Sequence, residues 1–169
     1  MRHHIRHFTA RHEPAGQIAA HLKSGAGAMI GIGAVGGLSV ATSLPLLIAP
    51  LGATVVLLFG QPASPLAQPM NIFGGYLLAT VLGVAAAFAF PGVWWIAAVA
   101  VGVAIAGMAL LRVTHPPAGA VPLVALASPV QSAWLFPTIL ISCVSLLALA
   151  LLHHRLPPRV QYPKQLPQD

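Results

Sequence analysis

The chain has 169 residues, of which 57% are hydrophobic and only 6% are charged, and its mean hydropathy is +0.86. Ordinary soluble domains carry about 25% charged residues, so this composition excludes a soluble globular domain and indicates an integral membrane protein. The net charge of +6 comes mainly from short, proline-rich terminal segments. Such segments do not form a folded basic face, so we expect no nucleic-acid partner.

Four apolar stretches have about the 20 residues that a helix needs to cross a bilayer. They are Gly25 to Ser43, Asn71 to Phe90, Val93 to Leu111 and Trp134 to Leu152, and none contains an acidic or basic residue. We therefore expect an all-α, polytopic membrane helical bundle over residues 25–152. A basic tail, residues 1–24, precedes this domain, and a basic, proline-rich tail, residues 153–169, follows it.

Two shorter apolar segments, Pro50 to Gly60 and Pro117 to Ala127, lie between the long ones and begin with proline. They resemble broken or re-entrant helices, because they are too short to cross a bilayer easily. A shift of 67 residues places Pro50 on Pro117 and also aligns the long stretches. This alignment predicts two repeats, residues 25–90 and 93–152, each with a long span, a short broken segment and a second long span.

The distribution of basic residues predicts the orientation. Seven of the eight lie in the two tails, so the positive-inside rule places both termini in the cytoplasm and requires an even number of crossings. If the short segments turn back, the chain has four crossings and parallel repeats. If they cross, it has six crossings and inverted repeats. Only the arrangement with six crossings puts Arg112 on the cytoplasmic side, so the positive-inside rule favours six. We expect the protein to lie in the inner membrane of a bacterium.

The segment Arg112 to Ala120, RVTHPPAGA, is unusual for apolar surroundings. Proline lacks an amide donor and suits the start of a helix. A helix beginning near Pro117 would direct free amides and its positive dipole end toward His115 and Arg112. The helix that begins at Pro50, with Gly52 and Thr54 in its first turn, would present a second set of free amides. Such an arrangement is typical of an anion site.

The residues that are absent support a negatively charged substrate. The only acidic residues, Glu13 and Asp169, lie in the tails, whereas cation and proton transporters place carboxylates within the membrane. His115 and Cys143 are the only probable metal ligands there, so we expect neither a metal nor another cofactor. An aspartyl protease is excluded and no GxSxG occurs, so we expect no enzyme.

Structural interpretations of the same residues remain open. Arg112 is also typical of an interfacial anchor at the end of a span, and His115 of a histidine bonded to a backbone carbonyl. Gln68 and Asn71 are equally consistent with ordinary loop amides. In the functional interpretation, His115 titrates near neutral pH, so anion uptake should rise as pH falls.

Two stretches together, LRVTHPPAGA (Leu111 to Ala120) and SPLAQPMNIFGG (Ser64 to Gly75), resemble the HPP family of integral membrane proteins. The resemblance implies four spanning helices and a transport function, with nitrite as substrate in some plant chloroplast and cyanobacterial members. Many relatives carry a basic residue in place of Met70, a histidine in place of Tyr76 and a threonine in place of Val121, which puts the substrate in doubt. The expected site residues are Arg112, Thr114, His115, Pro117, Gly119, Pro50, Gly52, Thr54, Gln68 and Asn71.

We therefore expect a transporter or channel for a small monovalent anion such as nitrite. The alternative is a non-transporting membrane scaffold or assembly protein, in which the prolines and glycines serve packing alone. A chain of 17.4 kDa offers little protein around a polar path. Small-residue pairs permit close helix contacts, so we expect a homodimer or homotrimer. These pairs are Gly27/Gly31, Gly33/Gly37 and Gly102/Ala106.

Overall fold

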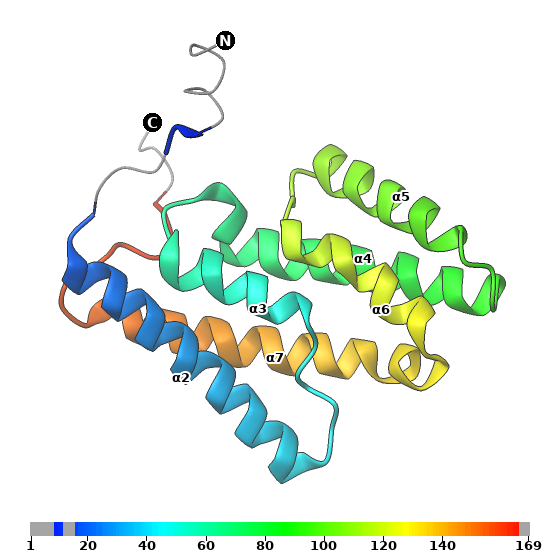
Figure 1. The fold of residues 1–169 in the computed structure, drawn as a ribbon, viewed down its shortest axis with the longest axis horizontal. Coiled ribbons are helices and arrows are strands. Elements are labelled where there is room, and N and C mark those ends of the chain that lie inside the picture. Colours follow the sequence, from blue (N-terminus) through cyan, green and yellow to red (C-terminus); the bar gives the residue numbers. More distant parts are fainter. Residues whose placement is uncertain (1–8, 12–15, 166–169) are drawn as a thin grey trace.

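The computed structural model describes residues 9–11 and 16–165, and all regular structure in this part of the chain is helical (Figure 1). Most of the expected N-terminal tail lies outside the described residues. The elements are α2 (Ile18–Thr42), α3 (Pro50–Val55), the π-helix η1 (Val56–Gly60), the 3-10 helix η2 (Pro65–Ala67), α4 (Pro69–Ala89), α5 (Ile96–Leu110), the 3-10 helix η3 (Pro116–Ala120), α6 (Val121–Ala127) and α7 (Pro129–Arg155).

Three helices in the described chain are long and apolar enough to cross a membrane: α2, α4 and the Ser132–Arg155 part of α7. The expected span from Val93 to Leu111 is only the 15-residue helix α5, about 22 Å long at 1.5 Å per residue. Helix α2 begins at Ile18, so residues 18–24 of the expected N-terminal tail belong to it. The described residues thus confirm the all-helical class, with three helices of membrane-spanning length and apolarity in place of the four expected long spans.

Proline determines where several helices begin. Pro50, Pro69, Pro116 and Pro129 each occupy the first position of a helix. The missing amide costs nothing there, and the fixed φ angle favours helical backbone. The two segments expected to be broken therefore start close to where the sequence predicts.

The first broken segment runs along α7. Residues 43–49 are not helical, and the carbonyls of Pro45 and Leu46 accept hydrogen bonds from Thr138 and Ser142 of α7. Farther along, near the end of α7, His154 Nε2 lies 2.9 Å from the carbonyl of Leu58 in η1. The chain between α2 and η2 therefore follows α7 toward its C-terminal end, first as extended chain and then as helix.

The second broken segment runs along α4 in the same manner. A Cβ atom added at Gly75 would lie 2.8 Å from the Cβ of His115, just before η3, and one at Gly83 would lie 2.8 Å from the Cα of Pro122 in α6. These close approaches show that η3 and α6 follow α4 toward its C-terminal end. Figure 1 shows α3 and α6 lying between the longer helices.

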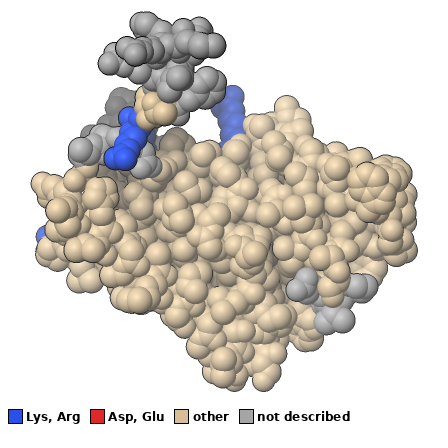
Figure 2. Space-filling model, viewed as in Figure 1, with Lys and Arg blue, Asp and Glu red and all other residues tan. Residues whose placement is uncertain are grey.

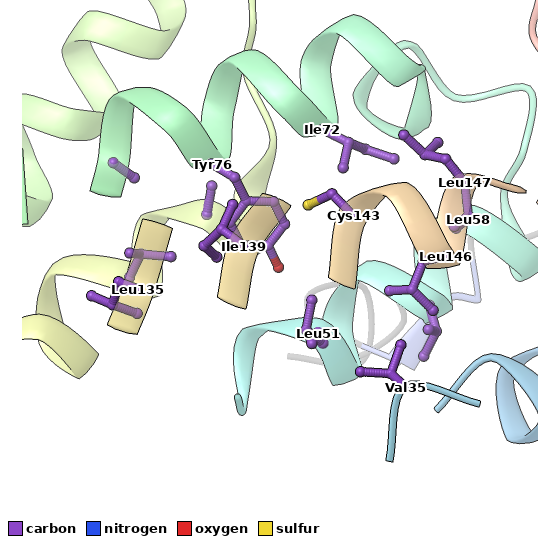
Figure 3. Packing of buried hydrophobic residues seen from close by; sticks show 14 of the residues in the cluster. Val35, Leu51, Leu58, Ile72, Tyr76, Leu135, Ile139, Cys143, Leu146 and Leu147 are labelled. Carbon is purple, nitrogen blue, oxygen red and sulfur yellow. The ribbon is translucent and has the colours of Figure 1, made fainter. Parts of the chain in front are cut away.

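The core lies between α4, α7 and the first broken segment. Figure 3 shows the side chains of Tyr76, Cys143 and Leu51 directed into it, together with neighbours from the same elements. Many large apolar side chains on the outside are exposed, including Met29, Val40 and Phe88. Figure 2 shows a few basic side chains at the upper and left edges of a largely uncharged surface. Exposed apolar surface of this extent fits a lipid environment.

Candidate functional site

His115 lies at the junction between α5 and η3, immediately before the first helical proline. Its backbone is extended, with φ −133° and ψ 100°, because the ring of Pro116 disfavours helical backbone at the preceding residue. The side chain is fully buried, as is that of Tyr76, and Thr54 is only 1% exposed. The proline pair thus turns the histidine into the protein interior.

The two ring nitrogens of His115 both have partners. Nδ1 lies 2.8 Å from the Leu66 carbonyl oxygen, which can only accept, so Nδ1 carries a proton. Nε2 lies 3.0 Å from the Thr54 hydroxyl. In the neutral tautomer, Thr54 donates to Nε2 and Tyr76, whose hydroxyl lies 2.7 Å from that of Thr54, donates to Thr54. Every hydroxyl proton in this cluster then has an acceptor.

The Thr54 hydroxyl has an alternative acceptor in the carbonyl of Pro50, 3.3 Å away. If Nε2 were also protonated, it would donate to Thr54, and Thr54 would turn to donate to Pro50. The oxygen of Thr54 has two lone pairs, so it can accept from His115 and Tyr76 together. The hydrogen bonds of the cluster can therefore be completed in either protonation state of His115 by rotating one hydroxyl group.

Tyr76 belongs to this cluster, although the sequence indicated it only as a departure from the family pattern. A tyrosine in an apolar span normally needs a partner for its hydroxyl, and this was the signal available. Its ring also packs against that of His115, with centroids 5.1 Å apart. The cluster of Thr54, Tyr76 and His115 thus joins the first broken segment, α4 and the start of the second.

The starts of the two broken segments face a common groove. It has a volume of about 590 Å³ and is lined by Ala49, Pro50, Ala53, Val56, Leu57, Pro116, Pro117 and Ala120. All of these side chains are apolar. Pro50 begins α3 and Pro116 begins η3, so the starts of both broken segments line this groove.

The expected free amides are largely used within the backbone. Leu51 and Gly52 donate to the carbonyls of Ile48 and Ala49, and Ala118 donates to that of His115. Pro116 and Pro117 have no amide to offer. A ligand in this groove would therefore need donors other than these amides.

Arg112 is not part of the cluster. Its backbone has φ 58°, in the left-handed region, and its side chain is exposed. The side chain makes no hydrogen bond or ion pair with the described residues, and it does not line the groove. Its position at the C-terminal end of α5 fits an interfacial anchor.

Two of the remaining expected site residues, Asn71 and Gln68, form hydrogen bonds to the backbone of the loops around the cluster. Asn71 donates to the carbonyl of Thr114 at 3.0 Å. Gln68 donates to the carbonyls of Pro62 and Ser64, and its Oε1 accepts from the amide of Lys164. Gly52 is exposed and Gly119 is half-buried. Among the described residues, no three histidine, cysteine or acidic side chains are placed to hold a metal ion.

Comparison with known proteins gives a family match across most of the chain. Residues 13–163 match the family model described as HPP, transmembrane region. One transmembrane protein of Dictyostelium discoideum is 37% identical over 89 residues, covering 50% of this chain and 29% of that protein. Another is 32% identical over 129 residues, covering 71% of this chain and 45% of that protein. The matched regions thus span less than half of these curated relatives. No solved structure matches the chain significantly.

Proposed function

The chain belongs to the HPP transmembrane family, and from this membership and the geometry above we propose that it transports or conducts a small monovalent anion. Nitrite is the first candidate, because the sequence resemblance implies it. The proposed site is the cluster of Thr54, Tyr76 and His115 together with the adjoining groove between Pro50 and Pro117.

The observation that carries this proposal is a buried polar cluster at the junction of two broken helices. Transporters place non-helical backbone at membrane depth where it is buried in protein or lines a substrate path. The described residues contain no aspartate or glutamate to balance a cation. Hydroxyl and imidazole donors without nearby carboxylates favour a negatively charged substrate.

The cluster is closed to solvent in this conformation, because His115 and Tyr76 are fully buried. Transport therefore requires the broken segments to separate and expose the cluster to an incoming ion. Arg112, exposed beyond the C-terminal end of α5, would attract anions toward this end of the bundle.

We further propose six crossings arranged as inverted repeats. Helix α2, the segment α3–η1 and α4 would form the first repeat, and α5, the segment η3–α6 and α7 the second. The support is that each broken segment runs beside a long helix of the other repeat: α3–η1 beside α7, and η3–α6 beside α4. This arrangement keeps both termini on the cytoplasmic side of a bacterial inner membrane.

The proposal is tested by measuring nitrite flux into liposomes that contain the purified protein. We expect saturable uptake that protein-free liposomes lack. Arg112→Gln should lower apparent affinity at every pH, because it removes an attracting charge. His115→Ala should flatten the pH dependence relative to wild type, a comparison that also corrects for protonation of nitrite itself. Absence of flux, or wild-type behaviour of both variants, would count against the proposal.

A scaffold or assembly protein is the second candidate. The apolar groove and the bonded helix-start amides favour it, because they leave little polar surface for an ion. The liposome measurement separates the two, since a scaffold moves no anion whether or not it is correctly folded.

We also propose a homodimer or homotrimer. Gly27 and Gly31 pack against Phe59 inside the subunit, whereas added Cβ atoms at Gly33, Gly37 and Gly102 would meet nothing within 4 Å. These outward glycines would allow close helix contacts between subunits. The detergent-corrected mass should be two or three times 17.4 kDa, and the mass of one subunit would contradict this.

A further inference from the structure

A second hollow lies where α2 begins and α7 ends, beside the end of η1. Its volume is about 450 Å³. Unlike the groove between Pro50 and Pro117, it is lined by several polar side chains, which come from α2, from the segment after η1 and from α7. We call it the Lys23 hollow, and its polar lining residues are Lys23, Ser24, Gln61, Ser64, His153 and His154.

Lys23 brings a positive charge to this hollow. Its ammonium nitrogen donates to the carbonyls of Leu156 and Pro158, each at 2.7 Å. An ammonium group has three N–H donors, so one remains. The carbonyls supply hydrogen bonds but no negative charge, and the described chain contains no carboxylate. Within the described residues, no acidic side chain compensates the charge of Lys23.

His154 lines the same hollow and carries an unpaired nitrogen. The residue is only 3% exposed. Its Nε2 lies 2.9 Å from the Leu58 carbonyl, so this nitrogen is the donor and Nδ1 of the neutral ring is an acceptor. Nδ1 is buried and has no hydrogen-bond partner within the described part of the protein. A buried acceptor of this kind normally has a bound partner.

From the uncompensated ammonium and the unpaired nitrogen, we infer that the Lys23 hollow binds a small, hydrated monovalent inorganic anion. The anion would accept from Lys23, and a small rotation of the His154 ring toward the hollow would let a water of the anion's hydration shell donate to Nδ1. The volume suffices, since a water molecule occupies about 30 Å³. This inference rests on the proposed function and deepens it, because the hollow adjoins Gly60, where the first broken segment ends.

A lipid phosphate has similar chemistry, but the surroundings favour a free ion. Pro158 and Val160, in the segment after α7, line the hollow, and the amide of Val160 donates to the carbonyl of His154. This segment continues to Tyr162, whose hydroxyl donates to Ala67. The segment after α7 thus lines the side of the hollow next to the Lys23 ammonium group, and this protein wall favours a small ion over a headgroup with two acyl chains.

The test measures nitrite binding by titration calorimetry, with the full chain in nanodiscs of phosphatidylcholine at constant ionic strength. Lys23→Gln should raise Kd about tenfold or more, because a charge-assisted hydrogen bond is lost. Lys23→Arg should stay within about threefold of wild type, since it keeps the charge. The matched control is Lys164→Gln, a lysine with an exposed side chain at the same end, and it should leave Kd unchanged.

A second measurement follows the histidine. The ¹⁵N resonance of His154 Nδ1 should shift when nitrite is added to wild type and should not shift in Lys23→Gln at the same concentration. The same resonance should shift in Lys23→Arg, which keeps the charge, so the measurement remains informative if Lys23→Gln fails to fold. An unchanged resonance in wild type that has bound nitrite would overturn the assignment of the anion to this hollow.

The outcomes separate this inference from the proposed function. An unchanged Kd in Lys23→Gln, or an equal loss in Lys164→Gln, would overturn the site. Competition by added phosphatidylglycerol at the same resonance would assign the hollow to a lipid headgroup instead. Binding at the hollow without nitrite flux in liposomes would contradict transport while leaving the binding site in place.

Discussion

Thr54 shows how one hydroxyl group organises the interior of this protein. It lies within hydrogen-bond distance of Tyr76, His115 and the Pro50 carbonyl. His115 is 61 residues from Thr54 along the chain. A buried polar atom without a hydrogen-bond partner lowers the stability of the fold. The side chains of Thr54, Tyr76 and His115 therefore depend on one another for their hydrogen bonds.

Replacing Thr54 by valine tests this dependence. The shape is kept, but Tyr76 and His115 each lose a partner, so we expect the free energy of unfolding to fall by about 1–3 kcal/mol. Thermal or chemical denaturation in detergent measures the change. Adding Tyr76→Phe should cost less than the sum of the single changes. Ser145→Ala is the control, because Ser145 only donates to Ile141 within its own helix; an equal loss there would contradict the prediction.

At the scale of helices, close packing against α4 depends on glycine. A Cβ atom at Gly83 would lie 2.8 Å from the Cα and 3.3 Å from the N of Pro122, so it would press on backbone that cannot turn away. Gly102 lies on the exposed side of α5 with nothing within 4 Å. Gly83 is therefore required by close packing, whereas the packing within the subunit does not require a glycine at Gly102.

Substituting each glycine by alanine should have opposite effects. Gly83→Ala should destabilise the fold by about 1–3 kcal/mol through overpacking. Gly102→Ala should be neutral or stabilise a lone subunit by up to about 1 kcal/mol, because alanine favours helix. Denaturation of both variants under conditions that keep the protein monomeric makes the comparison. Similar changes in the two variants would show that the space around Gly83 is not limiting.

The sequence predicted the helical class and the proline-started segments, because both follow from local properties of the chain. It overestimated the length of α5, since Trp94 and Trp95 count as apolar although the chain there lies in the turn before Ile96. It did not predict the role of Tyr76 or the bonding of the helix-start amides. These depend on contacts between distant segments, which periodicity and hydropathy do not contain.

At the scale of the whole molecule, the basic residues and the interfacial aromatic residues lie at opposite ends. Lys23 donates hydrogen bonds to carbonyls of the segment after α7. Farther along this segment, the amide of Lys164 donates to the side chain of Gln68, just before α4. Asn71, in the first turn of α4, donates to the carbonyl of Thr114. Trp94 and Trp95 follow the other end of α4 and are exposed. Tryptophan is enriched at membrane interfaces, and positive charge marks the cytoplasmic one.

This polarity predicts which loops a membrane-impermeant maleimide reaches in intact bacteria that express the protein. With six crossings, Pro91→Cys lies outside and is labelled, whereas Arg112→Cys and Lys164→Cys are labelled only after permeabilisation. With four crossings, Arg112→Cys is labelled from outside and Pro91→Cys is not, so the two arrangements give opposite results at both positions. Cys143 is fully buried and should remain unlabelled, and a Cys143→Ala background checks this. The Lys164→Cys variant confirms that intact cells exclude the reagent, because the C-terminal segment is cytoplasmic in both arrangements.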